Sequence, residues 1–400
     1  MSDTKIFKLN GKVQHYAWGG ADFIPALLHL SNNEKKPFAE YWMGAHDNVP
    51  SEVVLSNGAT QPLNEFIKKN PAGTLGATVA STFGRLPYLF KVLDVKDMLS
   101  IQVHPSKAAA ETAFEAENRK GTPLNAPNRN YKDNNHKPEL MLALSDFWLL
   151  HGFKSPEALS ELLLNTPELQ FLDPVFNGKN YEALYETVML MPQQEVNERL
   201  KPLIDRIVPL YEKGFLDRSQ EDFWAARAFN TFCEPNRMDR GIFSIYFFNL
   251  VHLTPGQAIF QDAGIPHAYL EGQNMELMAN SDNVLRGGLT NKYIDVTELM
   301  HHVRFEPVVP EILTGTAGSV AGEDRFPTPA ADFELRRLVL DKEVQLTTGT
   351  ADIYFVYEGE VKVGDLNLEE GAAFLAVAGA AFSIQPEGKA VLFRATVPNV

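Results

Sequence analysis

The stretch LSIQVHP, residues 99–105, decides how the first half of the chain is interpreted. Successive side chains of a strand point to opposite faces, so this stretch would have an apolar face and a polar face. The apolar face would carry Leu99, Ile101 and Val103, and the polar face would carry Ser100, Gln102 and His104. The stretch follows the apolar run PYLFKVL (87–93), which is typical of interior sheet. Because buried polar groups cost free energy unless they are paired, the polar face needs a common partner.

The composition predicts a globular protein of two or three domains, since 400 residues with 44% hydrophobic content can form substantial cores. No run of residues is apolar enough to span a bilayer, and the N-terminus lacks the apolar core of a signal peptide. The single cysteine, Cys233, excludes an internal disulfide, and the lack of an export signal leads us to expect a cytoplasmic protein. A net charge of −15 argues against a general binder of nucleic acid or of anionic membranes.

The pattern along the chain predicts a mainly β fold with a helical domain, an α+β arrangement. Residues 1–150 show mainly strands and turns, including an Asn57-Gly58 hairpin signal. Residues 155–235 show helical spacing, which begins with Ser155 as N-cap and Pro156 at the first helical position. Strand character returns at IFSIYFFNLVHL (242–253), and after residue 335 glycines separate short apolar segments as in a sandwich or jelly roll.

Three distant segments each offer metal ligands in a strand-like context. LSIQVHP contains Gln102 and His104, HKPELMLAL contains Glu139, and AGIPHAYLEG contains His267. Two imidazoles, a carboxylate and an amide oxygen suit Zn²⁺ and leave room for water or substrate. The alternative is two core histidines bonded to backbone and a carboxylate paired with Lys137. That alternative is simpler for each residue alone, whereas the residues taken together favour a metal site.

Basic residues indicate an anionic ligand. Lys91 lies within a strand that should be buried, so it needs a salt bridge or a bound anion. The segment MELMANSDNVLRGGLTNKYID (275–295) offers Arg286 and Lys292 around paired glycines, together with Glu276 and Asp282. Such groups can hold a phosphate, although composition alone favours an ordinary charged surface loop.

These segments together resemble the type I mannose-6-phosphate isomerases. The similarity rests on LSIQVHP, NYKDNNHKPEL, PHAYLEG and MANSDNVLRGGLTNKYID, and QHYAWGG, AEYWMGAHDNVPSEV and LPYLFKVLD are similar to the same family. The motifs extend from about residue 13 to 310 in the expected order. One departure is Asn291, where the family pattern has proline; this loosens a turn but leaves every polar group in place.

The resemblance implies a cupin-type jelly-roll catalytic barrel made of residues 1–150 plus 236–310. It also implies an inserted helical domain of residues 151–235 and a degenerate cupin-like β domain of residues 311–400. The implied protein is a monomer with one Zn²⁺ per chain that acts on a phosphosugar and has no nucleic-acid or membrane partner. By motif, the zinc ligands would be Gln102, His104, Glu139 and His267. Lys91, Ser100, Lys137, Arg286 and Lys292 would bind substrate, and Tyr269, Glu276 and Asp282 would complete the pocket.

The implied reaction interconverts mannose 6-phosphate and fructose 6-phosphate by proton transfer through an enediolate. Our first candidate for the base is Glu276, because a carboxylate near a dry metal pocket can be tuned for proton abstraction, and Lys137 and Asp282 are alternatives. Two other functions compete with this one. An Fe(II) cupin oxygenase would use His104, His267 and Glu139 as a facial triad. A non-catalytic sugar-phosphate-binding cupin would use its metal only to hold strands together.

Overall fold

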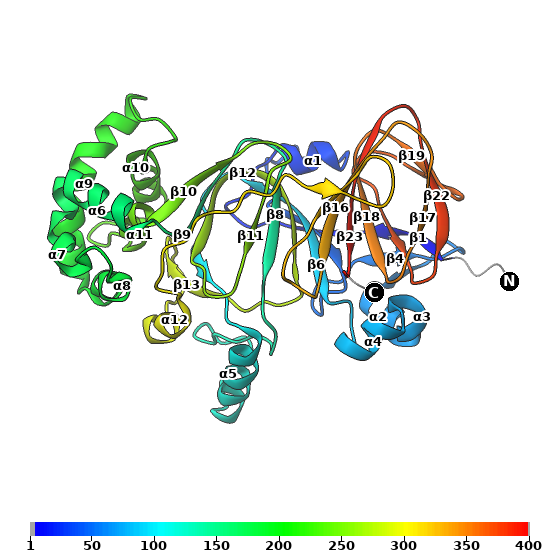
Figure 1. The fold of residues 1–400 in the computed structure, drawn as a ribbon, viewed down its shortest axis with the longest axis horizontal. Coiled ribbons are helices and arrows are strands. Elements are labelled where there is room, and N and C mark those ends of the chain that lie inside the picture. The colour runs from blue at the N-terminus through cyan, green and yellow to red at the C-terminus, as the bar shows by residue number, and fades with distance from the viewer. Residues whose placement is uncertain (1–4, 399–400) are drawn as a thin grey trace.

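The computed structural model describes residues 5–398. Figure 1 shows helices at one end, a sheet region in the middle and a second sheet region at the opposite end. The predicted mainly β fold with a helical segment is therefore confirmed. Within the described residues, no helix is both long and apolar enough to cross a membrane.

The middle region is a ten-stranded antiparallel sheet in the described part of the chain. Its strands are β2 (Lys12–Gln14), β3 (Glu40–Gly44), β6 (Tyr88–Val95), β7 (Ile101–Val103), β8 (Glu139–Ala143), β9 (Phe147–Phe153), β10 (Phe248–Leu253), β11 (Ala258–Gln261), β12 (His267–Ala279) and β13 (Leu285–Gly288). The longest is β12, which pairs with β7 and β9 near its start and with β6 and β8 along its second half. This change of partners brings segments far apart in sequence onto one strand.

Alternation along the buried strands separates an apolar core from a polar interior. On β6, Phe90 and Val92 pack in the core shared with the second sheet region, whereas Lys91 points to the opposite face. On β12, Met275 and Leu277 join that same core, and Glu276 lies opposite Lys91 in the strand register. The strands are buried on both faces because one face packs against protein and the other surrounds the polar interior.

The second sheet region combines both ends of the chain. Its larger sheet contains β1 (Ile6–Asn10), β4 (Glu52–Val54), β5 (Thr60–Pro62), β14 (Thr316–Ala317), β15 (Glu323–Phe326), β16 (Glu334–Leu340), β18 (Asp352–Glu358), β21 (Ala373–Ala376) and β23 (Ala390–Thr396). Its smaller sheet contains β17 (Val344–Thr347), β19 (Val361–Val363), β20 (Leu366–Leu368) and β22 (Ala381–Pro386). Strand β1 pairs with β21, so residues 1–150 contribute strands to both regions.

The helices at one end of Figure 1 form their own core. They are α6 (Pro156–Asn165), η1 (Pro167–Leu172), α7 (Asp173–Phe176), α8 (Tyr181–Leu190), α9 (Gln193–Glu212), α10 (Glu221–Phe232) and α11 (Gly241–Phe247). The predicted cap is confirmed, since the Ser155 hydroxyl accepts the Ala158 N–H at 3.2 Å. The strand predicted from residue 242 is wrong up to Phe247, because α11 is buried all round and its continuous apolar run has no distinguishing period.

The remaining helices lie around the sheets. They are α1 (Phe23–Leu27), α2 (Leu63–Lys69), α3 (Pro71–Leu75), α4 (Ala77–Phe83), α5 (Lys107–Arg119) and α12 (Val296–His302). The Asn57-Gly58 hairpin is confirmed between β4 and β5, where Gly58 has a φ of 82°. Within the described chain, the main strand path of the middle sheet runs open from β10 to β2. The predicted jelly-roll barrel and domain boundaries therefore remain predictions.

Candidate metal centre and substrate cavity

The stretch LSIQVHP (99–105) contains the three-residue strand β7. Ile101 and Val103 are buried against the helical core, as the alternation predicts. Gln102 lies directly opposite His267 of β12 and also faces β13. Leu99 precedes the strand and packs in a different apolar cluster, so the predicted apolar face holds only for the strand itself.

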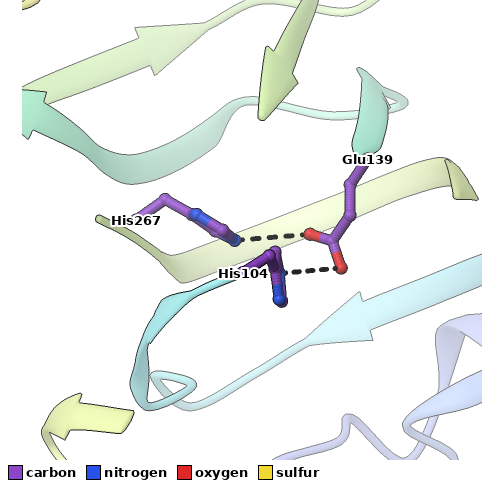
Figure 2. Close-up of side chains that lie close together, drawn as sticks. All are labelled: His104, Glu139 and His267. Atoms are coloured by element: carbon purple, nitrogen blue, oxygen red, sulfur yellow. Dashed lines mark ion pairs between the residues drawn. The ribbon is translucent and has the colours of Figure 1, made fainter. Parts of the chain in front are cut away.

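Three of the predicted metal ligands meet in one buried cluster. One ligand atom from each of His104, Glu139 and His267 lies within 4.8 Å of the other two. Figure 2 shows both imidazoles directed at the same carboxylate. The Nε2 atom of His104 is 3.4 Å from Glu139 Oε1, and Nε2 of His267 is 3.3 Å from Oε2. The fold therefore brings together segments that are separated by up to 163 positions in the chain.

Hydrogen bonding fixes which nitrogen of each ring is free. Nδ1 of His104 lies 2.9 Å from the carbonyl oxygen of Asn283, and Nδ1 of His267 lies 2.9 Å from that of Ile265. A carbonyl oxygen only accepts, so each Nδ1 carries a proton, and Nε2 is the ring nitrogen left to bind a cation. Both Nε2 atoms are buried and have no hydrogen-bond partner among the described residues. If these were ordinary core histidines, hydrogen bonds to backbone would satisfy the rings. Such bonds are present, but they satisfy only Nδ1 of each ring and leave Nε2 without a partner in the described chain.

The charge of this cluster suits a divalent cation. Burial lowers the pKa of His104 to about 4, although Glu139 opposes this shift, so the ring is neutral at neutral pH. Burial would raise the pKa of Glu139, but Lys137 and His104 outweigh it and keep the carboxyl well below its usual range. A carboxylate that faces two ring nitrogens without hydrogen-bond partners offers three ligand atoms to a cation between them. Nitrogen and oxygen ligands with outward-bonded Nδ1 atoms are the usual environment of Zn²⁺.

A cavity of about 590 Å³ opens beside this cluster. Predicted site residues that line it are Lys91, Ser100, Gln102, Lys137, Asp282, Arg286 and Lys292. Glu276 and Tyr269 are buried but are not part of the lining. Burial first, and the neighbouring Glu276 and Glu139 carboxylates second, raise the pKa of Tyr269 well above its ordinary value. The Tyr269 hydroxyl therefore stays protonated at neutral pH.

Lys91 presents a fixed positive charge to the cavity. Its Nζ lies 2.9 Å from Glu276 Oε2 and 3.4 Å from Glu40 Oε2, and it stands 5.1 Å from the centre of the Trp42 ring. Burial alone would lower the pKa of Lys91, but the two carboxylates outweigh burial and raise it. The salt bridge that an interior lysine requires is thus present, and the amine stays protonated.

Arg286 and Lys292 line the cavity without an acidic partner. Neither forms a salt bridge within the described chain, where 20 other lysines and arginines pair with a carboxylate. Burial lowers the pKa of each, and for Lys292 the Arg286 charge adds to the effect. Half-buried Arg286 and exposed Lys292, neither with a counter-ion in the described chain, together suit an anion.

Asp282 lies at the cavity wall and is held from two sides. Its carboxylate lies 3.1 Å from Nε2 of His46, and its own N–H donates to Asp133 at 2.8 Å. Burial would raise the pKa of Asp282, but the bond to His46 and nearby cations outweigh it and lower the pKa. Asp282 is therefore an ionised carboxylate with direct access to the cavity.

Comparison with known proteins gives one consistent family. A model described as the catalytic domain of phosphomannose isomerase type I matches residues 6–156. The chain is 41% identical to the mannose-6-phosphate isomerase of Salmonella typhimurium, over 88% of this chain and 89% of that protein. It is 36% identical to the Escherichia coli enzyme of the same name, over 96% and 97% of the two chains. This chain belongs to the type I mannose-6-phosphate isomerase family.

Solved structures of the family have the same fold. A mannose 6-phosphate isomerase from Salmonella typhimurium, described as bound to fructose 6-phosphate and zinc, superposes with a TM-score of 0.87 at 35% identity. The match covers 98% of this chain and all of that one. A zinc-bound isomerase structure matches with the same TM-score at 34% identity. The predicted family membership is confirmed over nearly the whole chain, including the helical and C-terminal regions.

Several cavity residues were not identified from the sequence. Glu40 and Trp42 of β3 lie beside Lys91, and His46 follows that strand and holds Asp282. Tyr16 and Trp18 also line the cavity. All five stand in the motifs QHYAWGG and AEYWMGAHDNVPSEV, which were assigned to the family without individual roles. One sequence feature could have indicated two of them: Glu40 and Trp42 are two residues apart, so they point to the same face of a strand.

We expect the isomerase chain to bind one equivalent of Zn²⁺ and to remain folded when a chelator removes the ion, because strand pairing builds the site. At zinc concentrations about 100 times the Kd, stability should rise by about 2.7 kcal/mol. Metal analysis and thermal unfolding with and without zinc measure both effects. His104→Ala should lose the bound zinc, whereas His252→Ala, at a half-exposed histidine paired with Asp146, should retain it. Full zinc occupancy in His104→Ala would contradict the assignment.

Proposed function

We propose that this chain is a zinc-dependent isomerase that interconverts mannose 6-phosphate and fructose 6-phosphate. The observation that carries the proposal is a cavity that opens beside the cluster suited to a cation and is lined by two basic residues suited to a phosphate. An oxygenase would have no use for the unpaired Arg286 and Lys292. Membership of the isomerase family supports the same choice.

The metal would be held by His104, Glu139 and His267, with Gln102 as a fourth ligand from the cross-strand position opposite His267. Bound zinc would supply Lewis-acid polarisation of the substrate oxygens at C1 and C2. Gln102 is neutral, so the four ligands contribute only one negative charge, that of Glu139. A second carboxylate in its place would cancel the positive charge that favours an anionic intermediate.

The phosphate would bind to Arg286 and Lys292, which reach the cavity from the strand β13 and the loop after it. Arg286 can form a forked pair of hydrogen bonds, and Lys292 adds a point charge. Ser100 offers a hydroxyl at the same cavity. Fixing the phosphate places C1 and C2 toward Gln102 and Lys137, which line the cavity where it approaches the metal cluster.

Lys91 and Lys137 would stabilise negative charge on the enediolate. Glu276 and Glu40 keep Lys91 protonated, and Nζ of Lys137 lies 2.8 Å from Glu139 Oε1. A fixed cation interacts more strongly with the anionic intermediate than with the neutral open-chain sugar, and this difference lowers the barrier. A protonated lysine cannot accept a proton, so Lys91 has an electrostatic role.

Proton transfer requires one group that takes the proton from C2 of the aldose and returns a proton to C1, while the O2 proton moves to O1. Our first candidate from sequence, Glu276, is bonded to Lys91 and does not line the cavity. Asp282 lines the cavity as an ionised carboxylate, so its access supports it over Glu276. We therefore propose Asp282 as the proton carrier and Glu276 as the group that fixes the charge of Lys91.

The finer description of the fold is also a proposal. We propose a cupin-type jelly roll for residues 1–150 plus 236–310, a helical insertion of residues 151–235 and a degenerate cupin for residues 311–400. Separate apolar cores in the helices and between the two C-terminal sheets support this division, although β1, β4 and β5 extend the C-terminal sheet. A monomeric state and a cytoplasmic location belong to the same proposal.

The proposed reaction is tested by coupling fructose 6-phosphate formation from mannose 6-phosphate to a reporter enzyme. We expect activity in the zinc-loaded protein, loss of activity after chelation and recovery on adding zinc back. Mannose without its phosphate should be a much poorer substrate, because it cannot occupy the Arg286 and Lys292 site. A zinc-loaded, folded protein that converts neither phosphosugar would rule out the proposed function.

Arg286→Ala should mainly weaken binding of the phosphorylated sugar. We expect KM for mannose 6-phosphate to rise about 10- to 100-fold, the effect of losing a charged hydrogen bond of roughly 1.5–3 kcal/mol. Steady-state kinetics measure this change. Arg304→Ala, which removes an exposed arginine paired with Asp262 outside the cavity, is the matched control. Unchanged KM and kcat in Arg286→Ala would remove Arg286 from the site.

Asp282→Asn should slow exchange of the C2 hydrogen with solvent deuterium about 100-fold or more, the usual contribution of a general base. Zinc content should not change, because Asp282 is not one of the clustered ligands. Asp146→Asn, at an exposed aspartate that does not line the cavity, serves as the control. Normal exchange in Asp282→Asn together with lost exchange in Glu276→Gln would instead assign the base to Glu276.

A further inference from the structure

The segment that carries both unpaired cations contains a strained backbone. Leu289 lies between Arg286 and Lys292 and has a φ of 52°, in the left-handed region that a leucine side chain rarely occupies. It is fully buried in the helical core, so solvent cannot satisfy its backbone N–H. Such a conformation persists only where surrounding groups hold it in place.

A single carboxylate outside the substrate cavity holds this segment. Oδ1 of Asp239 accepts the N–H of Leu289 at 2.8 Å and that of Gly241 at 2.7 Å, and Oδ2 accepts the N–H of Thr290 at 3.0 Å. Asp239 is not among the residues that line the 590 Å³ cavity. Its carboxylate therefore ties the strained turn to the start of helix α11.

The connection continues to the cation itself. The hydroxyl of Thr290 accepts the backbone N–H of Lys292 at 3.1 Å. Asp239 accepts the N–H of Thr290, and Thr290 accepts the N–H of Lys292, whose amine carries the charge. Asp239 acts on the Lys292 backbone through one intermediate residue.

Backbone packing leaves no room for a looser arrangement. A Cβ atom at Gly241 would lie 2.6 Å from the Leu289 nitrogen, and one at Gly288 would lie 2.5 Å from the Gly241 Cα. The turn after β13 and the start of α11 therefore touch through their main chains, and the Asp239 carboxylate lies beside this contact. Movement of either segment would disturb the hydrogen bonds by which Asp239 joins Gly241 to Leu289 and Thr290.

We infer that Asp239 is a positioning residue for the phosphate site: it holds the Leu289–Thr290 backbone so that Lys292 is fixed in the cavity beside Arg286. The inference rests on the proposed function, because it takes the substrate phosphate as the ligand of Lys292. Asp239 itself does not line the cavity, so we assign it no part in proton transfer.

The test measures phosphate binding separately from folding and chemistry. Asp239→Ala should raise KM for mannose 6-phosphate about 10-fold, near the lower end expected for loss of hydrogen bonds to a charged group. The inhibition constant of inorganic phosphate should rise by the same factor, while kcat changes by less than about twofold, since the reacting groups are untouched. Asp239→Asn keeps the shape but places an amide NH₂ against a backbone donor, so it should show an intermediate effect.

Glu323→Gln is the matched control, because Glu323 is also a buried carboxylate that accepts a backbone N–H, that of Ser319 at 2.8 Å. It lies in the C-terminal sheet region, away from the cavity lining. Its replacement should lower the unfolding temperature without changing the inhibition constant of phosphate.

A double-mutant cycle separates positioning from general loss of structure. In a Lys292→Ala background the charge that Asp239 positions is absent, so adding Asp239→Ala should leave the inhibition constant of phosphate unchanged within about twofold. Fully additive effects would overturn the inference, as would an unchanged phosphate constant in folded, zinc-loaded Asp239→Ala. If neither Asp239 variant folds, Asp239 is a stability residue and the inference fails. Lack of isomerase activity in the unaltered protein would instead reject the proposed function.

Discussion

Two imidazole nitrogens without a hydrogen-bond partner in the described chain and one carboxylate face one another in a buried site, and the surrounding sheet must maintain this arrangement. His104 and His267 cannot turn away, because each Nδ1–H is bonded to a backbone carbonyl. Glu139 cannot neutralise itself by taking a proton, because Lys137 lies 2.8 Å from its Oε1. An arrangement of this kind gains energy from a bound divalent cation, so the cost of building it is recovered when the metal binds.

The sheet can hold this cluster because strand β12 contacts different partners along its length. His267 at its start faces β7, and Glu276 further along faces Lys91 of β6. Between these polar positions, Ala268 and Leu270 pack in the helical core, and Met275 packs in the core shared with the second sheet region. The metal cluster and the Lys91 ion pair are therefore placed by one rigid element. Buried ion pairs of this kind contribute little net stability, which suggests that they are present for placement and charge.

The polar face of LSIQVHP, the helical caps and the three clustered metal ligands could be predicted from sequence because each depends on local period or on family motifs. The pairing of strands that are far apart in the sequence could not be predicted, and this pairing decides the remaining features of the fold and the site. The pairing of β1 with β21 joins residues some 370 positions apart and leaves no local signal. The segment of α11 was misassigned because a helix buried on all sides has no apolar stripe. The same holds for Glu276. The motif places it near the site, but its hydrogen bond to Lys91 depends on the register between β12 and β6, which the sequence does not indicate.

The distribution of counter-ions explains how an acidic protein can select an anionic substrate. Two of the four basic side chains that line the cavity are paired with carboxylates: Lys91 with Glu276 and Glu40, and Lys137 with Glu139. Arg286 and Lys292 are left without a carboxylate in the described chain, and burial depresses the pKa of both. Their partial desolvation is an unfavourable term in the free protein, and a phosphate group removes it on binding. A neutral sugar cannot provide this compensation. In the proposed assignment, the phosphate binds at the two cations that have no carboxylate partner, and the reacting carbons lie beside the cations that have one.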